Sequence, residues 1–220
     1  KPHFKRIVLR VFENTAALEA NLLAGGVDYI PGEAGLTLDQ VIALEQRHPQ
    51  RFRYVYKSTT SYSHLDVNLE HSALKDRRVR QALLLAADRD AIARQIYGGK
   101  VVLAHSSVNH LQWMAVADVK KYPFDPPAAK RLLNEAGWSK IEGGIRHNAA
   151  GERLTFTLAG VAGIKTNELI MSVLAAQWRQ VGVDARIRGQ PARVFFGDTL
   201  QRRKFDGLAF FGWIVSPESV

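Results

Sequence analysis

Leu74-Lys-Asp-Arg-Arg-Val-Arg-Gln-Ala-Leu-Leu-Leu-Ala-Ala-Asp-Arg-Asp-Ala-Ile92 is the stretch that defines the local architecture most sharply. Asp76 stands where a helix N-cap is expected, because its carboxylate can accept hydrogen bonds from the free N–H groups of the first turn. Val79 and Leu83 then recur at helical spacing and predict one apolar face. A second helix runs to Tyr97, where Gly98 can end it in the left-handed conformation.

The overall composition is that of a globular protein. The chain has 220 residues, of which 46% are hydrophobic and 23% charged, so it can bury a substantial core. No apolar run approaches the roughly 20 residues needed to span a bilayer. Lys1-Pro-His-Phe4 has neither an initiator Met nor a signal-peptide pattern, and we read this start as a cut. Because the chain has no cysteine, disulfides and thiol chemistry are excluded.

The net charge of +9 leaves two interpretations of the surface. A basic nucleic-acid-binding module would carry such a charge, but would concentrate it in a patch. Here Lys and Arg are scattered, and the densest run, Arg202-Arg-Lys204, is short. The sequence therefore favours a solvated basic surface and no nucleic-acid partner, with the binding module as an alternative.

Strands and helices alternate along the chain, which predicts a layered α/β architecture. Apolar or alternating runs predict strands, and capped periodic segments predict helices. The predicted strands are 7–12, 27–30, 52–56, 62–68, a hairpin over 144–158 that turns at 148–151, 183–188 and a central strand at 208–215. The predicted helices are 15–24, one opening at 37–40 and running to 48, 125–137, 167–181 and a helical piece at 193–203.

The order of several motifs carries a family resemblance. Asn68, Asp76-Arg-Arg-Val-Arg-Gln-Ala82 and Ala87-Asp-Arg89 resemble the signature of the extracytoplasmic solute-binding proteins of family 5. These are the oligopeptide-, dipeptide- and nickel-binding components of ABC importers. Three further segments resemble the family in the same order, so that the resemblance covers nearly the whole chain: Asn21-Leu-Leu-Ala-Gly-Gly-Val-Asp28, the segment 122–138, and Gln177-Trp-Arg-Gln-Val-Gly-Val183 followed by Phe205-Asp206.

The resemblance implies a fold and a function. The expected fold is a periplasmic-binding-protein-like type II lobe, in which helices flank a mixed β-sheet. Residues 1–56 would be the tail of the first lobe and lead to the crossing between lobes, and residues 57–220 would be most of the second, ligand-binding lobe. The protein would capture a peptide or other small solute between two lobes and deliver it to an ABC transporter permease in the membrane. The implied location is periplasmic, and no cofactor is required.

A catalytic or metal role is the main alternative for the polar residues. His64-Leu-Asp66 places both side chains on one face of a predicted strand, with Tyr62 and Asn68 alongside. No Cys partner, His-Glu-x-x-His helix or Gly-x-Ser-x-Gly turn accompanies them. We therefore predict neither an enzyme nor a metal site, and interpret this face as the lining of a cleft. A two-lobe enzyme with an unrecognised site is the rival hypothesis.

The resemblance also indicates which residues line the ligand cavity. Peptide-binding members carry Gly-Trp-x-x-Asp, in which the Trp lines the cavity and the Asp pairs with the α-amino group of the peptide. Gly212 and Trp213 match, whereas Ser216 occupies the position of the Asp and cannot supply that charge. Arg193 lies where some relatives present a cavity-facing aromatic residue. The predicted ligand-binding residues are Tyr62, His64, Arg193, Trp213 and Ser216, and for Trp213 and Arg193 the alternatives are a core aromatic and a solvated helix residue.

Overall fold

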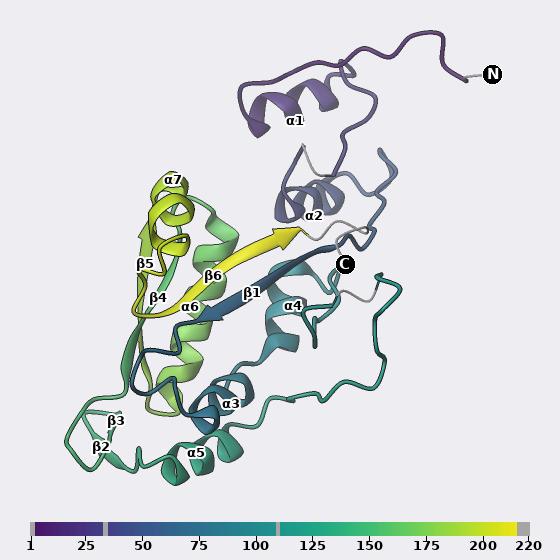
Figure 1. The fold of residues 1–220 in the computed structure, drawn as a ribbon. Helices are drawn as coiled ribbons and strands as arrows, with labels where there is room; N and C mark the ends of the chain where they lie inside the picture. Colours follow the sequence, from purple (N-terminus) through teal and green to yellow (C-terminus); the bar gives the residue numbers. More distant parts are fainter. Residues whose placement is uncertain (1–2, 33–34, 109–110, 215–220) are drawn as a thin grey trace. The chain divides into compact units, whose positions relative to one another are not determined.

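The computed structural model describes residues 3–32, 35–108 and 111–214 (Figure 1). The chain divides into two compact units, residues 1–55 and 56–220. Each unit has its own buried apolar cluster.

The first unit contains two helices, α1 (Thr15–Leu23) and α2 (Leu38–Arg47). Both begin at a side-chain cap, since Asn14 Oδ1 accepts from the N–H of Ala17 at 2.9 Å and Gln40 Oε1 accepts from the N–H of Thr37 at 3.0 Å. The two predicted helices are therefore confirmed. Their small shared core consists of Leu22, Leu36 and Leu44.

The strands predicted at 7–12, 27–30 and 52–56 are wrong, because the described part of the first unit contains no strand. Ile7, Leu9 and Val11 are exposed, although their apolar character suggested a buried strand. An apolar run indicates that its side chains tend to be buried. A strand also needs a neighbouring backbone with which to form hydrogen bonds. The first unit supplies no such neighbour within its described residues.

A four-stranded mixed sheet organises the second unit (Figure 1). Its order is β1-β6-β4-β5; β1 and β6 are antiparallel, and β6, β4 and β5 run parallel. The central position predicted for the strand at 208–215 is confirmed, because β6 lies between β1 and β4. The strand bounds are β1 Ser61–Val67, β4 Thr155–Val161, β5 Asp184–Gln190 and β6 Gly207–Ile214.

Helices connect these strands and form the main core with one face of the sheet. Parallel neighbours require a crossover, which α6 supplies between β4 and β5. Val79 and Leu83, which were expected on one apolar face, are buried, and so are Leu133, Phe156 and Trp178. The helix bounds are α3 Arg77–Leu85, α4 Arg89–Tyr97, α5 Pro126–Glu135, α6 Lys165–Gln180, α7 Ala192–Val194 and the π-helix η1 Phe195–Leu200.

The predicted hairpin over 144–158 forms only beside its turn, where His147 makes an antiparallel bridge with Arg153 and the N–H of Leu154 donates to the carbonyl of Arg146 at 2.8 Å. A second hairpin joins β2 (Lys140–Glu142) to β3 (Ile145–His147) and turns at Gly143 and Gly144, both of which have positive φ. A turn does form at 148–151, where the N–H of Gly151 donates to the carbonyl of Asn148 at 3.0 Å. The strand that follows, β4, instead pairs in parallel with β5 and β6.

The Asp76 cap of α3 gives a first testable prediction. Its Oδ1 accepts from the N–H of Arg78 at 2.8 Å, and the Arg78 guanidinium donates to the carbonyl of Glu135 at 2.6 Å, which ties α3 to α5. We expect Asp76→Ala to lower the free energy of unfolding by about 1 kcal/mol. Asp76→Asn keeps a capping acceptor and should lower the free energy of unfolding by less. Urea denaturation followed by circular dichroism measures both, and equal losses would contradict the capping argument.

The same carboxylate should contribute to acid sensitivity. Hydrogen bonds from Arg78 lower the pKa of Asp76 below its usual value. A carboxyl whose pKa is lower in the folded state stabilises the fold above its unfolded pKa of about 4, and this contribution is lost as the pH falls through the folded value. The difference in stability between the chain and Asp76→Asn should therefore shrink in acid.

Candidate functional site: an aromatic surface on the sheet

The face of the sheet opposite the main core carries three of the five residues predicted to bind ligand, Tyr62, His64 and Trp213. In the antiparallel pair β1 and β6, Tyr62 lies opposite Trp213 and His64 lies opposite Phe211. Side chains two residues apart on a strand point to the same side, so these four share one face. The intervening residues Leu208 and Phe210 belong to the main core on the other side.

The aromatic rings on this face contact one another. The ring centroids of His64 and Phe211 are 4.3 Å apart, those of Tyr62 and His64 5.0 Å, and those of Phe211 and Trp213 6.3 Å. The edge-to-face geometry at Phe211 is the arrangement that aromatic pairs favour. Tyr62, His64 and Trp213 are therefore brought together as the sequence predicted, with Phe211 at their centre.

The π-helix η1 adds two more rings. Phe195 and Phe196 each lie 6.1 Å from Phe211, measured between ring centroids. Phe195 is fully buried, whereas Phe196 is 44% exposed and Trp213 54% exposed. We call the set Tyr62, His64, Phe195, Phe196, Phe211 and Trp213 the aromatic surface. Its buried members hold the exposed ones in place, which leaves an apolar area open to a ligand.

A polar pair adjoins the aromatic surface. His64 Nε2 lies 3.3 Å from Asp66 Oδ1, and His64 Nδ1 is buried without a hydrogen-bond partner. This confirms that both side chains share one strand face. Among the described residues, no group of three or more His, Cys, Asp and Glu side chains could hold a metal ion. The pair can donate and accept hydrogen bonds at the edge of an aromatic wall.

The other two predicted residues are not part of this arrangement. Arg193 lies on α7, where it is exposed, and it forms no ion pair with any residue that the structure describes. Ser216 lies outside the described residues. The ligand-binding role of all five residues stays a prediction.

Sequence reasoning missed three members of the aromatic surface, Phe195, Phe196 and Phe211. A signal for Phe211 was present, since it precedes Trp213 by two residues on the same predicted strand and must share its face. No local signal pointed to Phe195 and Phe196, because their place depends on how η1 packs across the sheet.

The second unit is thus a mixed α/β sheet with one face covered by helices and exposed aromatic rings on the other. The sequence pattern of the bacterial extracellular solute-binding proteins, family 5 (middle part), matches residues 1–219, and the chain belongs to this family. The family binds solutes for ABC import systems and is not one of enzymes. Among the described residues, every helix is too short or too polar to cross a membrane.

Similar proteins support the assignment. The oligopeptide-binding protein AppA of Bacillus subtilis is 27% identical over 84% of this chain, and its structure with a nonapeptide matches 94% of the chain with a TM-score of 0.75. The structure of NikA of Brucella suis, solved with Fe(III)-EDTA, matches 97% of this chain with a TM-score of 0.84 and 25% sequence identity. The dipeptide-binding protein of Escherichia coli is 32% identical over 68% of the chain.

The chain spans only part of the length of these relatives. It covers 34% of AppA and 26% of the dipeptide-binding protein by sequence, and 42% of the NikA chain by structure. The match to a peptide-bound and to a metal-chelate-bound protein establishes the fold and the family, and leaves the ligand open.

Proposed function

We propose that this chain is part of the substrate-binding component of an ABC importer and that its aromatic surface forms one wall of the solute site. The observation that carries the proposal is the exposure of Trp213, whose ring packs against the buried ring of Phe211. Exposed aromatic rings held by a rigid scaffold give a ligand a large apolar contact at low entropic cost. Family membership supplies the class of solute carrier.

The mechanism we propose is reversible capture without covalent chemistry. Residues 1–56 would form the tail of a first lobe, and residues 57–220 most of the second. The two lobes of the whole protein would close about a hinge, so that a solute lying on the aromatic surface is covered and then delivered to the membrane permease. We place this protein on the outer side of the cytoplasmic membrane, in the periplasm, as the family description supports.

The class of solute follows from the polar groups near the wall. The site would offer aromatic faces, the His64–Asp66 pair and, on α7, the exposed cation Arg193. Ser216 stands where peptide-binding members have an aspartate, so the charge that would hold an ammonium group is missing at that position. We propose a solute with acceptor or anionic groups in preference to a peptide held by its free amino terminus.

The test is Trp213→Ala in the full-length protein. We expect it to weaken binding of the solute that co-purifies with the protein by at least about 1 kcal/mol, roughly fivefold in Kd, through lost stacking and burial. Mass spectrometry identifies the solute, and titration calorimetry measures the affinity. Trp113→Ala is the matched control, since Trp113 is exposed and lies outside the aromatic surface.

Two results would contradict the proposal. Unchanged affinity in Trp213→Ala would show that the aromatic surface does not contact the solute. Tight binding of di- to pentapeptides that disappears when their amino terminus is acetylated would overturn the solute class.

A further inference from the structure

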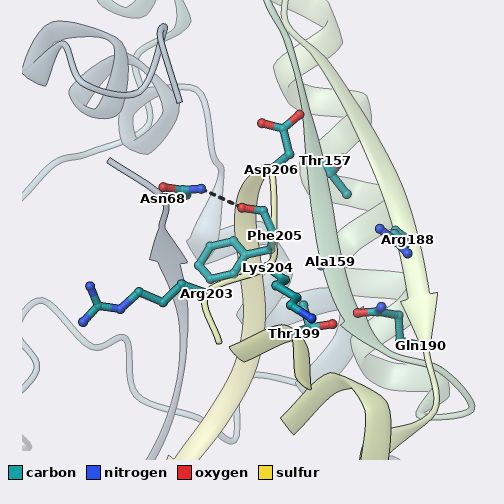
Figure 2. A pocket seen from close by; sticks show the side chains of 10 residues that line it. All are labelled: Asn68, Thr157, Ala159, Arg188, Gln190, Thr199, Arg203, Lys204, Phe205 and Asp206. Atoms are coloured by element: carbon teal, nitrogen blue, oxygen red, sulfur yellow. Dashed lines mark hydrogen bonds between the residues drawn. The ribbon is translucent and has the colours of Figure 1, made fainter. Parts of the chain in front are cut away.

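A cavity of about 260 Å³ lies on the sheet at a place that shares no residue with the aromatic surface (Figure 2). It opens between β4, β5 and the segment that leads from η1 into β6. Ala159 and Phe205, two of its lining residues, also pack in the apolar cluster beneath η1. The lining consists of Asn68, Thr157, Ala159, Arg188, Gln190, Thr199, Arg203, Lys204, Phe205 and Asp206.

The cavity contains an unpartnered polar group. Gln190 is 8% exposed, and its Oε1 is buried without a hydrogen-bond partner. Figure 2 shows its amide turned toward Thr199, whose side chain is also buried. Buried polar atoms without partners are rare in folded proteins because they lose water and gain nothing in return. A ligand that accepts hydrogen bonds would bond to this amide through its NH2 group, which a half-turn of the amide brings to the position of Oε1.

The charge around this amide is mainly positive. Arg188 comes from β5 two residues before Gln190, and it forms no ion pair with the residues that the structure describes. Lys204 Nζ lies 3.0 Å from Asp198 Oδ1, and Asp198 itself is outside the lining. The one lining carboxylate, Asp206, is mostly exposed and lies 3.7 Å from His71. The cavity therefore presents cations beside neutral hydrogen-bonding groups.

The backbone brings Lys204 to the cavity through a strained turn. Arg203 has a φ of 54°, and is the one non-glycine residue with positive φ among those described. In this conformation the N–H of Lys204 donates a hydrogen bond to the carbonyl of Thr199, near the end of η1, at 2.7 Å. Backbone strain of this kind persists where the surrounding structure enforces it and concentrates at binding sites. In Figure 2 the Arg203 guanidinium points away from Gln190, so it contributes charge at the rim.

We propose that this cavity binds a small organic or inorganic anion. Its carboxylate or phosphate oxygens would accept from Arg188 and Lys204, while the Thr199 hydroxyl and the Gln190 amide complete the hydrogen bonding. The volume suits a small anion and is too small for an extended peptide. The site is separate from the aromatic surface and does not depend on the function proposed for it.

The experiment titrates the full-length protein with succinate and with inorganic phosphate, against a constant chloride background, by calorimetry. We expect one of the two anions to bind. Arg188→Gln should raise the Kd of that anion about tenfold, because it removes a charge-assisted hydrogen bond. Gln190→Leu should weaken the binding of the anion several-fold. The melting temperature should stay unchanged or rise, because the substitution removes an unpartnered buried atom. The anion that binds more tightly identifies the acidic group.

Arg186→Gln is the matched control. Arg186 lies on the same strand and face as Arg188, carries the same charge, and lies outside the cavity. Its replacement should change the affinity less than twofold. Equal losses of anion affinity in Arg186→Gln and Arg188→Gln would show that the anion responds to the general positive charge of the surface, which would overturn the proposal. The absence of binding by both anions would overturn it as well. Anion binding that weakens in Trp213→Ala and not in Arg188→Gln would place the anion on the aromatic surface and overturn this proposal, whereas failure of the function proposed for the aromatic surface would leave the effect of Arg188→Gln unchanged.

Discussion

Trp178→Ala is expected to lower the free energy of unfolding by about 3–5 kcal/mol, as truncation of large buried aromatic side chains does. Trp178 is 1% exposed and packs edge-to-face against Phe156, with ring centroids 6.0 Å apart. Its indole N–H donates to the carbonyl of Leu83 at 2.9 Å. The truncation therefore leaves a cavity between α6 and the sheet and also takes the partner from a buried carbonyl in α3.

Urea denaturation followed by far-ultraviolet circular dichroism measures this effect without relying on the fluorescence of the replaced residue. Trp113→Ala is the control, because Trp113 is 81% exposed and its loss should change stability by less than about 0.5 kcal/mol. Trp178→Phe should fall between the two, since it keeps most of the volume and loses the hydrogen bond. A loss below about 1 kcal/mol in Trp178→Ala would contradict the central place assigned to this residue.

Helices of the second unit could be predicted because their signals are local. Asp76 and Asp125 cap the helices that they precede, and Pro126 occupies the first turn. At the end of α5, Gly137 has a φ of 90° and the N–H of Trp138 donates to the carbonyl of Leu133 at 2.9 Å, a helix end that glycine favours. These interactions join residues within five positions of one another, so that the sequence contains both partners.

Strand pairing could not be predicted in the same way. The partners of β4 are β5 and β6, which begin about 30 and 50 residues later at Asp184 and Gly207. The alternating run at 154–158 indicated a strand, but the pairing suggested by the nearest turn ends at Arg153 and Leu154 and does not extend along β4. The extended run at 7–12 shows the converse error, because apolar residues without a neighbouring backbone form no strand.

The candidate site also combines residues that local patterns indicate with residues that only long-range packing places. Tyr62, His64 and Asp66 could be assigned to one strand face by their alternation, and Trp213 to the cavity by the family resemblance. The observed register places Tyr62 opposite Trp213. Phe195 and the unpartnered amide of Gln190 could not be found, because both depend on how the segment from α7 to β6 crosses the sheet. Whether these groups bind a solute stays a prediction for the experiments above.

Arg146, on β3, has partners that no local pattern indicates. It is 3% exposed, and no carboxylate pairs with it among the described residues. Its guanidinium donates to the carbonyls of Val181 and Trp138, both at 2.7 Å, and to the side-chain oxygen of Asn134. These acceptors lie at the C-terminal ends of α6 and α5, where a positive charge is favourable. Burial lowers the pKa of Arg146.

We expect Arg146→Met to lower the free energy of unfolding by about 3 kcal/mol, because it leaves three acceptors without their donor at two helix ends. Arg146→Lys should recover only part of the loss, since one ammonium group cannot reproduce the planar set of donors. Arg153→Met is the control, because Arg153 forms an exposed ion pair with Asp184 at 3.3 Å, and its loss should stay below about 1 kcal/mol. Urea denaturation compares the three variants. Equal losses in Arg146→Met and Arg153→Met would mean that the buried guanidinium joins α5 to α6 no more strongly than a surface charge does.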